Sequence, residues 1–219
     1  MRAIAEGIHV HETPQRFLGL EVGARMTVMQ LHGGLLVHSP VALPPSAVAD
    51  LGPLRWVLAP NKLHHLHAGP WIDAGAEACC GRGLPEKRPD LSFDRVIEEE
   101  GEPFGDQVLA VPMRCFPFAN EVVLLHRPSR TLVVTDLLFH LQPTDPWLTR
   151  LAFRCLCAYP GCRTSLLERV AMQRDVARRE IDRLLDLDSD RVVMAHGAVL
   201  ETGGKRALAE AFAWLSGRP

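Results

Sequence analysis

The chain has 219 residues and a mass of 24.2 kDa, enough to bury the core of one large domain or two small ones. It is 47% hydrophobic and 23% charged with a net charge of −2, a balance typical of globular proteins and without the basic excess of nucleic-acid binders. No apolar run approaches the roughly 20 residues that span a bilayer, and the first residues, with Glu6, lack the apolar stretch of a secretory signal. We therefore expect a cytoplasmic protein whose partner is a small-molecule substrate or an anion, with no nucleic-acid or membrane partner. The oligomeric state stays open.

The cysteines do not follow a metal-binding or disulfide pattern. An adjacent pair matches no zinc spacing, and residues i and i+2 of a helix do not share a face. In a reducing compartment we expect all six to remain buried or incidental thiols. They are Cys79, Cys80, Cys115, Cys155, Cys157 and Cys162.

The first half of the chain alternates apolar runs with turn residues, which predicts a region rich in strands. His32-Gly33-Gly34 separates two such runs and indicates a hairpin, while Pro44 and Pro45 mark the start of a short helix. Glycine, proline and charge dominate residues 81–105, which we expect to form a long surface loop with one helical turn near the site. The other expected elements are strands at 26–31 and 35–38, a helix to about 50, a strand at 54–58, one or two helical turns at 69–75 and a strand at 76–80.

The second half changes from strands to helices. Arg127-Pro128-Ser129-Arg130 is a good turn between two strands. The expected elements are strands at 107–111, 121–126 and 131–135, helices at 147–157 and 165–185, a strand at 191–195 and a helix at 204–215. The helix at 165–185 is predicted to be long and amphipathic, with Leu166, Val170, Ile181, Leu184 and Leu185 facing inward. No linker interrupts the chain, so residues 1–219 are expected to form a single domain.

Ligand-type side chains follow three of the predicted strands. Three of the ten histidines, His64, His65 and His67, come just after the strand at 54–58. Two later strands lead into Asp136 and His196. Neutral imidazole and carboxylate are common ligands of zinc and iron, and side chains at strand ends of α/β folds converge at one sheet edge. The pattern indicates a metal site, although the histidines could instead bond one another or the backbone, and Asp136 could cap a turn.

Several segments together resemble the metallo-β-lactamase superfamily, and more closely its uncharacterised branch known as the domain of unknown function 4336 (DUF4336). The resemblance covers nearly the whole chain. It implies a mixed α/β fold, a four-layer αββα sandwich with the metal site at one edge between the sheets. The segments that carry it are Arg25-Met26-Thr27-Val28, His38-Ser39-Pro40-Val41, Pro60-Asn61-Lys62-Leu63-His64-His65, Thr135-Asp136-Leu137-Leu138-Phe139 and Ala195-His196-Gly197.

The superfamily motif, His-x-His-x-Asp-His, is degenerate in this sequence. Pro60 and Lys62 fall on its first two histidines, His64 falls on the aspartate and His65 on the last histidine. The histidine that usually follows in a Gly-His-Thr context has no counterpart near residues 112–115. One metal position has thus lost its histidines, and Lys62 would place a cation there.

The resemblance implies that the other metal position survives. Asp136 matches the bridging aspartate and His196 the terminal histidine, so the implied ligands are His64, His65, Asp136 and His196. His38 stands where many members carry an aspartate that supports the site. A catalytic zinc needs three protein ligands plus water, so one Zn ion, or Fe or Mn, is the expected cofactor.

Two functions are compatible with this site. The first is a mononuclear metal-dependent hydrolase of an ester, thioester, lactone or phosphoester, in which Lys62 would stabilise an oxyanion and His64 or His67 would carry a proton. The second is a non-catalytic binding or regulatory protein that keeps the fold with a structural ion, a bound anion or no metal.

Overall fold

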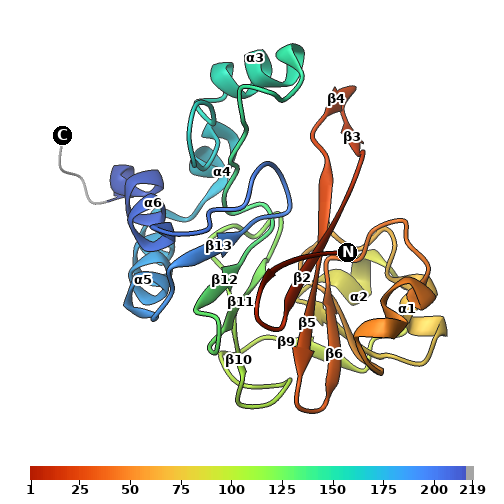
Figure 1. Cartoon of the computed structure of the whole chain (residues 1–219). Coiled ribbons are helices and arrows are strands. Elements are labelled where there is room, and N and C mark those ends of the chain that lie inside the picture. Colours follow the sequence, from red (N-terminus) through yellow and green to blue (C-terminus); the bar gives the residue numbers. More distant parts are fainter. Residues whose placement is uncertain (216–219) are drawn as a thin grey trace.

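The computed structural model describes residues 1–215, and two β-sheets form its centre, face to face (Figure 1). The first sheet has seven strands in the order β1-β2-β5-β6-β7-β8-β9, and the second has four in the order β10-β11-β12-β13. The strands of the first sheet are β1 (Arg2–Ala5), β2 (Ile8–Thr13), β5 (Ala24–Leu31), β6 (Gly34–His38), β7 (Leu54–Ala59), β8 (Glu77–Gly81) and β9 (Arg95–Ile97). Those of the second are β10 (Val108–Pro112), β11 (Val122–His126), β12 (Thr131–Val133) and β13 (Arg191–Val193).

Helices cover the outer face of each sheet, which completes an αββα sandwich (Figure 1). A short hairpin, β3 (Arg16–Phe17) with β4 (Leu20–Glu21), projects between β2 and β5. On the first sheet lie η1 (Pro45–Leu51), α1 (Gly69–Asp73) and α2 (Leu84–Lys87). On the side of the second sheet lie α3 (Trp147–Cys155), α4 (Leu166–Ala171), α5 (Arg174–Asp186), α6 (Gly204–Ala211) and η2 (Ala213–Leu215).

Alternation along the strands builds the core in layers. On β10, Val108 and Ala110 face the first sheet, whereas Leu109 and Val111 face the helices. Period-two alternation of this kind lets one strand serve two apolar layers, as expected for a sheet covered on both faces. The two-sheet core is thereby fixed in register, and it holds the loops at the strand ends in place.

Three strands deliver their following loops to one end of the sandwich. The chain after β7 leads into the histidine loop, the chain after β12 leads to Asp136, and the chain after β13 leads to His196. β12 and β13 are paired in parallel, so their carboxyl ends lie at the same edge. This is the placement that the sequence predicts for the candidate ligands.

The structure corrects the predicted helix at 165–185. Met172 and Gln173 are extended, with ψ values of 140° and 102°, so the segment splits into α4 and α5. Leu166 and Val170 are exposed rather than inward-facing, while Ile181 and Leu184 are buried. The break has a tertiary cause, because the Gln173 N–H donates to the Cys115 carbonyl and Met172 is buried in the core.

Two further differences concern strands. The sequence did not predict β1 to β4, and the expected loop at 81–105 contains the short strand β9 as well as the helical turn α2. β9 pairs in parallel with β8, which lies earlier in the chain. It forms because the fold brings it beside β8, and its own three residues give no strand pattern. Within residues 1–215, no helix has the length and apolar character to cross a membrane.

Candidate metal site

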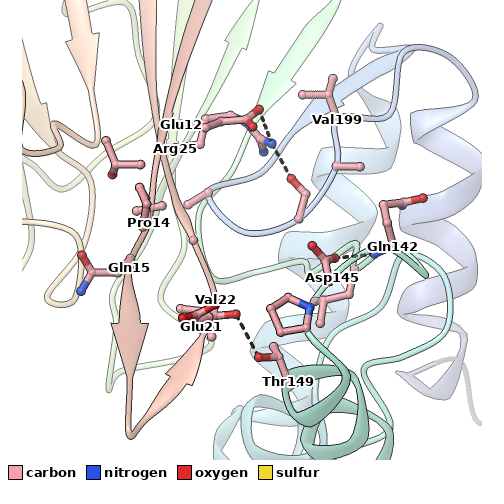
Figure 2. A pocket seen from close by; sticks show the side chains of 18 of the residues that line it. Glu12, Pro14, Gln15, Glu21, Val22, Arg25, Gln142, Asp145, Thr149 and Val199 are labelled. Carbon is pink, nitrogen blue, oxygen red and sulfur yellow. Dashed lines mark hydrogen bonds and ion pairs between the residues drawn. The ribbon is translucent and has the colours of Figure 1, made fainter.

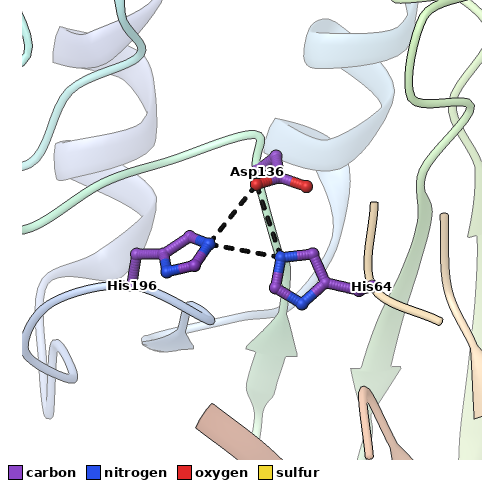
Figure 3. A group of neighbouring side chains, drawn as sticks. All are labelled: His64, Asp136 and His196. Carbon is purple, nitrogen blue, oxygen red and sulfur yellow. Dashed lines mark hydrogen bonds and ion pairs between the residues drawn. The ribbon is translucent and has the colours of Figure 1, made fainter. Parts of the chain in front are cut away.

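Three ligand-type side chains converge between the two sheets: His64, Asp136 and His196 (Figure 3). The Nε2 atoms of the two histidines are 3.2 Å apart. Asp136 Oδ1 lies 3.4 Å from His64 Nε2 and 3.5 Å from His196 Nε2. The three atoms therefore form a nearly equilateral triangle. A tetrahedral zinc site with bonds of 2.0–2.1 Å has ligand atoms about 3.4 Å apart, so the triangle has the size that one ion needs.

His64 is held by residues on two different loops. Asn61 Oδ1 accepts hydrogen bonds from the backbone N–H groups of Leu63 and His64, both at 2.8 Å, which shapes the turn after β7. Ser39 Oγ, just after β6, lies 2.8 Å from His64 Nδ1. With one ring nitrogen engaged by Ser39, the other is directed at Asp136 and His196.

The tautomer of neutral His196 is set by a backbone carbonyl. Its Nδ1 lies 2.7 Å from the oxygen of Gly23, which can only accept a hydrogen bond. Nδ1 therefore carries the proton, and Nε2 presents a lone pair to the group. The loop itself is anchored by Arg25 of β5, whose guanidinium donates to the carbonyls of Met194 and Gly197.

Asp136 is positioned by two buried side chains. Asn61 donates 2.7 Å to Asp136 Oδ2 and 2.8 Å to Thr135 Oγ1. Glu121 accepts from the backbone N–H groups of residues 135, 136 and 137, at 2.6, 2.9 and 3.0 Å. Asn61 thus fixes two members of the group at once, because it also shapes the turn at His64.

Electrostatics keep Asp136 ionised. Burial alone would raise the pKa of Asp136. With the imidazoles protonated, the charge of His64 and hydrogen bonds from the Nε2–H groups of His196 and His64 outweigh burial and hold the pKa well below the usual range. With neutral imidazoles whose Nε2 atoms carry lone pairs, a bound cation would take the place of those protons beside the carboxylate. Burial, and next the charge of Asp136, raise the pKa of Glu121 to about 7, partly offset by its backbone hydrogen bonds. The group therefore combines one carboxylate with two imidazoles, a donor set suited to Zn²⁺ or Fe²⁺.

The other predicted residues lie outside this group. The His65 ring is turned toward Arg88, whose Nη1 lies 2.9 Å from its Nδ1, and burial followed by the charges of Lys87, Arg88 and His64 lowers its pKa to about 4. Lys62 Nζ donates to the Pro117 carbonyl at 2.5 Å. His67 is half-buried and does not belong to the group either.

His38 is enclosed near His64 without joining the group. Burial, together with the charge of His64, lowers its pKa to about 3, so it is neutral at physiological pH. The structure thus brings together three of the four predicted ligands, His64, Asp136 and His196, and places His65 elsewhere.

Access to the group is narrow. The side chains of His64, Asp136 and His196 are 11%, 8% and 11% exposed. A cavity of about 1080 Å³ lies beside the group, between the stem of the β3–β4 hairpin and the chain around α3 (Figure 2). Gly23, Arg25, Ala195 and Gly197 line it, so the segments that hold His196 form one of its walls.

Several residues that build the site were not predicted from the sequence. Asn61, Glu121 and Ser39 act through hydrogen bonds that depend on tertiary structure. For Asn61 there was a local signal, because an Asn two residues after a strand often caps a turn. Glu121 carried no such signal, since a glutamate at the start of a strand is ordinarily exposed.

Comparison with known proteins identifies the architecture. No family model matches the chain, and no curated protein does. Solved structures do match: the DIM-1 metallo-β-lactamase is 12% identical over 97% of this chain and 95% of its own, with a TM-score of 0.68. The chain has the metallo-β-lactamase fold.

Two further metallo-β-lactamase structures support this assignment. The enzyme from Pontibacter korlensis is 13% identical over 99% of this chain and 98% of its own, with a TM-score of 0.66. FIM-1 from Pseudomonas aeruginosa, solved in its mono-zinc form, is 9% identical over 99% of this chain and 95% of its own, with a TM-score of 0.70. Identities this low establish the fold alone, so the chemistry of the site has to come from its own residues.

Proposed function

We propose that the protein is a mononuclear metal-dependent hydrolase whose ion is held by His64, Asp136 and His196. One observation carries this proposal: the three ligand atoms lie 3.2, 3.4 and 3.5 Å apart, close to the edge of a tetrahedral zinc site. Three protein ligands leave the fourth position for water or substrate. The mono-zinc form of FIM-1 is a precedent for a single ion in this fold.

Each residue has a defined task in the proposed site. Asp136 contributes the negative charge that offsets the ion, and Asn61 keeps its second oxygen occupied. Gly23 holds His196 in the tautomer whose Nε2 can bind a metal, and Ser39 orients His64. When bound, a Zn, Fe or Mn ion lowers the pKa of water toward about 7 and polarises a carbonyl or phosphoryl oxygen.

The roles of His64 and Lys62 in catalysis differ. We propose His64 as a ligand, which leaves its imidazole unable to act as a free proton carrier. Lys62 could meet a developing oxyanion only if its hydrogen bond to Pro117 were released. Its ammonium group is therefore a weaker candidate for catalysis than the three ligands.

We also propose that the chain has lost the second metal position of the superfamily motif. Among residues 1–215 only one group of three ligand-type side chains is close enough to hold an ion. This supports at most one tightly bound ion per chain and the assignment of Pro60 and Lys62 to vacated histidine positions. We retain as proposals the relation to the DUF4336 branch and an ester, thioester or phosphoester substrate.

Location and domain organisation are proposed on separate grounds. All six cysteines are free thiols, which supports a cytoplasmic location. The ligands come from both sheets, which supports one domain over 1–219. Limited proteolysis tests the latter: cleavage is expected first within 81–105 with the remainder still associated, and two independently folding fragments would contradict it.

A second function is favoured by the enclosure of the group. The three side chains are at most 11% exposed, and none of them lines the adjacent cavity. A non-catalytic protein with a structural ion would have this closed arrangement. Without an ion, one proton between the two Nε2 atoms would also fit their 3.2 Å separation.

Elemental analysis of protein purified without a nickel column separates these functions, combined with a screen of generic ester, thioester and phosphoester substrates. One ion per chain with turnover that is lost in His196→Ala supports the hydrolase. His32→Ala is the matched control, because His32 is exposed in the turn between β5 and β6 and outside the group. One ion without turnover supports the structural site, and absence of an ion refutes both metal assignments.

A further inference from the structure

Helix α3 presents an apolar face to solvent. Trp147, Leu148 and Leu151 are 68%, 48% and 50% exposed, whereas Thr149 and Phe153 are buried. At 3.6 residues per turn, positions 147, 148 and 151 fall within about 100° of the helix circumference, and the buried positions 149 and 153 lie on the opposite side. The exposed apolar stripe therefore points away from the protein that α3 packs on.

Helix α4 repeats the pattern. Leu166, Leu167 and Val170 have the same i, i+1, i+4 spacing and are 43%, 61% and 78% exposed. No residue of α4 is buried. Because none of these apolar side chains packs into the core, the apolar surface of α4 is free to contact a binding partner.

The tip of the β3–β4 hairpin adds two more apolar side chains. Phe17 is 59% exposed and Leu18 is 88% exposed. The hairpin and α3 lie at the same end of the molecule (Figure 1) and are joined by a hydrogen bond of 3.0 Å from Thr149 Oγ1 to the Glu21 carbonyl. The eight side chains, which we call the apolar end, are Phe17, Leu18, Trp147, Leu148, Leu151, Leu166, Leu167 and Val170.

The apolar end stands out from the remaining surface. Twelve large hydrophobic residues are exposed in the described part of the chain, and eight of them belong to it. The charges beside it are also uneven: residues 147–171 contain four arginines and one acid, Glu168, in a chain with a net charge of −2. Glu168 is hydrogen-bonded by Ser165 Oγ, and Arg154 and Arg163 are exposed.

We propose that the apolar end docks on the surface of a membrane that contains anionic phospholipid. Leucine and tryptophan side chains would enter the boundary between headgroups and acyl chains, and the arginines would contact the phosphates. The excess of arginine in residues 147–171 argues against a second copy of the chain as the partner of the apolar end. A twofold-symmetric dimer would bring these positively charged segments close together. The anionic cytoplasmic leaflet matches the location proposed above.

Peripheral docking requires no spanning segment. The expectation that the protein has no membrane partner rested on the lack of such a segment and does not bear on a surface contact. The apolar end is also connected to the metal site, because Phe153 of α3 packs edge-on against Phe139 at 5.2 Å, and Phe139 stacks on His196 at 5.9 Å. Membrane docking does not depend on the proposed hydrolysis.

Vesicle sedimentation with the full chain tests this proposal. Vesicles of phosphatidylcholine with 30% phosphatidylglycerol are expected to bind the protein, and vesicles of phosphatidylcholine alone are expected to bind it at least about tenfold more weakly. The tryptophan emission should shift to shorter wavelength on binding. Replacing Trp147 by Phe should reduce this shift while leaving binding largely intact, because Trp56 and Trp71 are buried. Trp214, whose ring lies 5.9 Å from the Arg169 guanidinium of α4, keeps its own contribution to the emission.

Variants separate the apolar and ionic contributions. Trp147→Ser with Leu151→Ser should weaken binding about tenfold or more, and Arg154→Glu with Arg163→Glu should weaken it by a similar factor. Phe118→Ser is the matched control, because Phe118 is 65% exposed but outside the apolar end, and it should bind like the parent. All replaced side chains are on the surface, so each variant is expected to fold, and its thermal unfolding is to be measured alongside binding.

Three results would overturn the proposal. The first is no binding of the folded parent to anionic vesicles, the outcome expected if the occupant is an acidic protein. The second is binding that both double variants retain in full. The third is a concentration-dependent dimer of the parent that Trp147→Ser with Leu151→Ser converts to a monomer, which would assign the apolar end to a second copy of the chain.

Discussion

His64 and His65 are neighbours in sequence, yet they belong to two different environments. His64 is turned toward Asp136 and His196, and its ring is set by Ser39 from another loop. His65 is turned toward Arg88, which is engaged in turn by Asp90. The difference teaches that a ligand is defined by what reaches it from distant elements. The sequence favours His65, which falls on the last histidine of the superfamily motif, over His64, which falls on its aspartate, whereas the structure places His64 and not His65 in the group.

The loss of Glu121 should have the largest effect on the His64 side. Glu121→Ala leaves three buried backbone N–H groups without an acceptor, and each costs roughly 1–3 kcal/mol. We expect the free energy of unfolding, measured in urea, to fall by about 3 kcal/mol or more. Glu121→Gln keeps one acceptor oxygen and should recover part of the loss.

Arg88→Ala is the corresponding substitution at His65, and it should lower the free energy of unfolding much less than Glu121→Ala. Arg88 bonds His65 and the exposed Asp90, and pairs with exposed partners contribute roughly 1 kcal/mol or less. A loss for Arg88→Ala as large as that for Glu121→Ala would contradict the distinction between the two sides.

Asn61→Ala should reduce zinc affinity strongly without removing a ligand. Asn61 holds Asp136 Oδ2 and shapes the turn that carries His64, and loss of such supporting partners typically costs 10–100-fold in metal affinity. Titration against a competing chelator measures the change. Asn120→Gly is the control, because the Asn120 amide donates to the Arg82 carbonyl near the surface and glycine tolerates the positive φ of 53° at this position. Unchanged affinity in a folded Asn61→Ala protein would show that Asp136 needs no such support.

Lys62→Met should have the smallest effect. The Lys62 ammonium is bonded to the Pro117 carbonyl and not to the ligand group, so zinc affinity is expected to change by less than about twofold. The same chelator titration applies. A tenfold change in either direction would place the Lys62 charge next to the ion and would contradict its observed position.

The sequence predicts most of the fold because its strands are marked by apolar runs and turn residues. The hairpin of β5 and β6, the strand β7 and the strands around Arg127-Pro128 all occur close to the predicted positions. Periodicity failed where tertiary contacts override it: the segment 165–185 has an amphipathic pattern throughout, yet it breaks at Met172 and Gln173. β9 is too short to be recognised before its partner β8 is known.

The sequence predicts where the candidate site lies, but it predicts the set of ligand residues only in part. Strand ends placed Asp136 and His196 at one edge, because parallel β12 and β13 end together. The choice between His64 and His65 depends on ring orientation, which is decided by Ser39 and Arg88. Those contacts join residues more than twenty positions apart in the chain, so the local spacing of ligand-type residues does not predict them.

A zinc titration of the parent, His64→Ala and His65→Ala against a competing chelator tests the metal site most directly. Removing His64 leaves two ligands and should weaken binding by more than about 100-fold, beyond the range of a supporting residue. Removing His65 should change affinity by less than about threefold, because its ring lies outside the group. If His65→Ala weakens binding as much as His64→Ala, or if the parent binds zinc no better than micromolar, then His64, Asp136 and His196 are not the metal site of this protein.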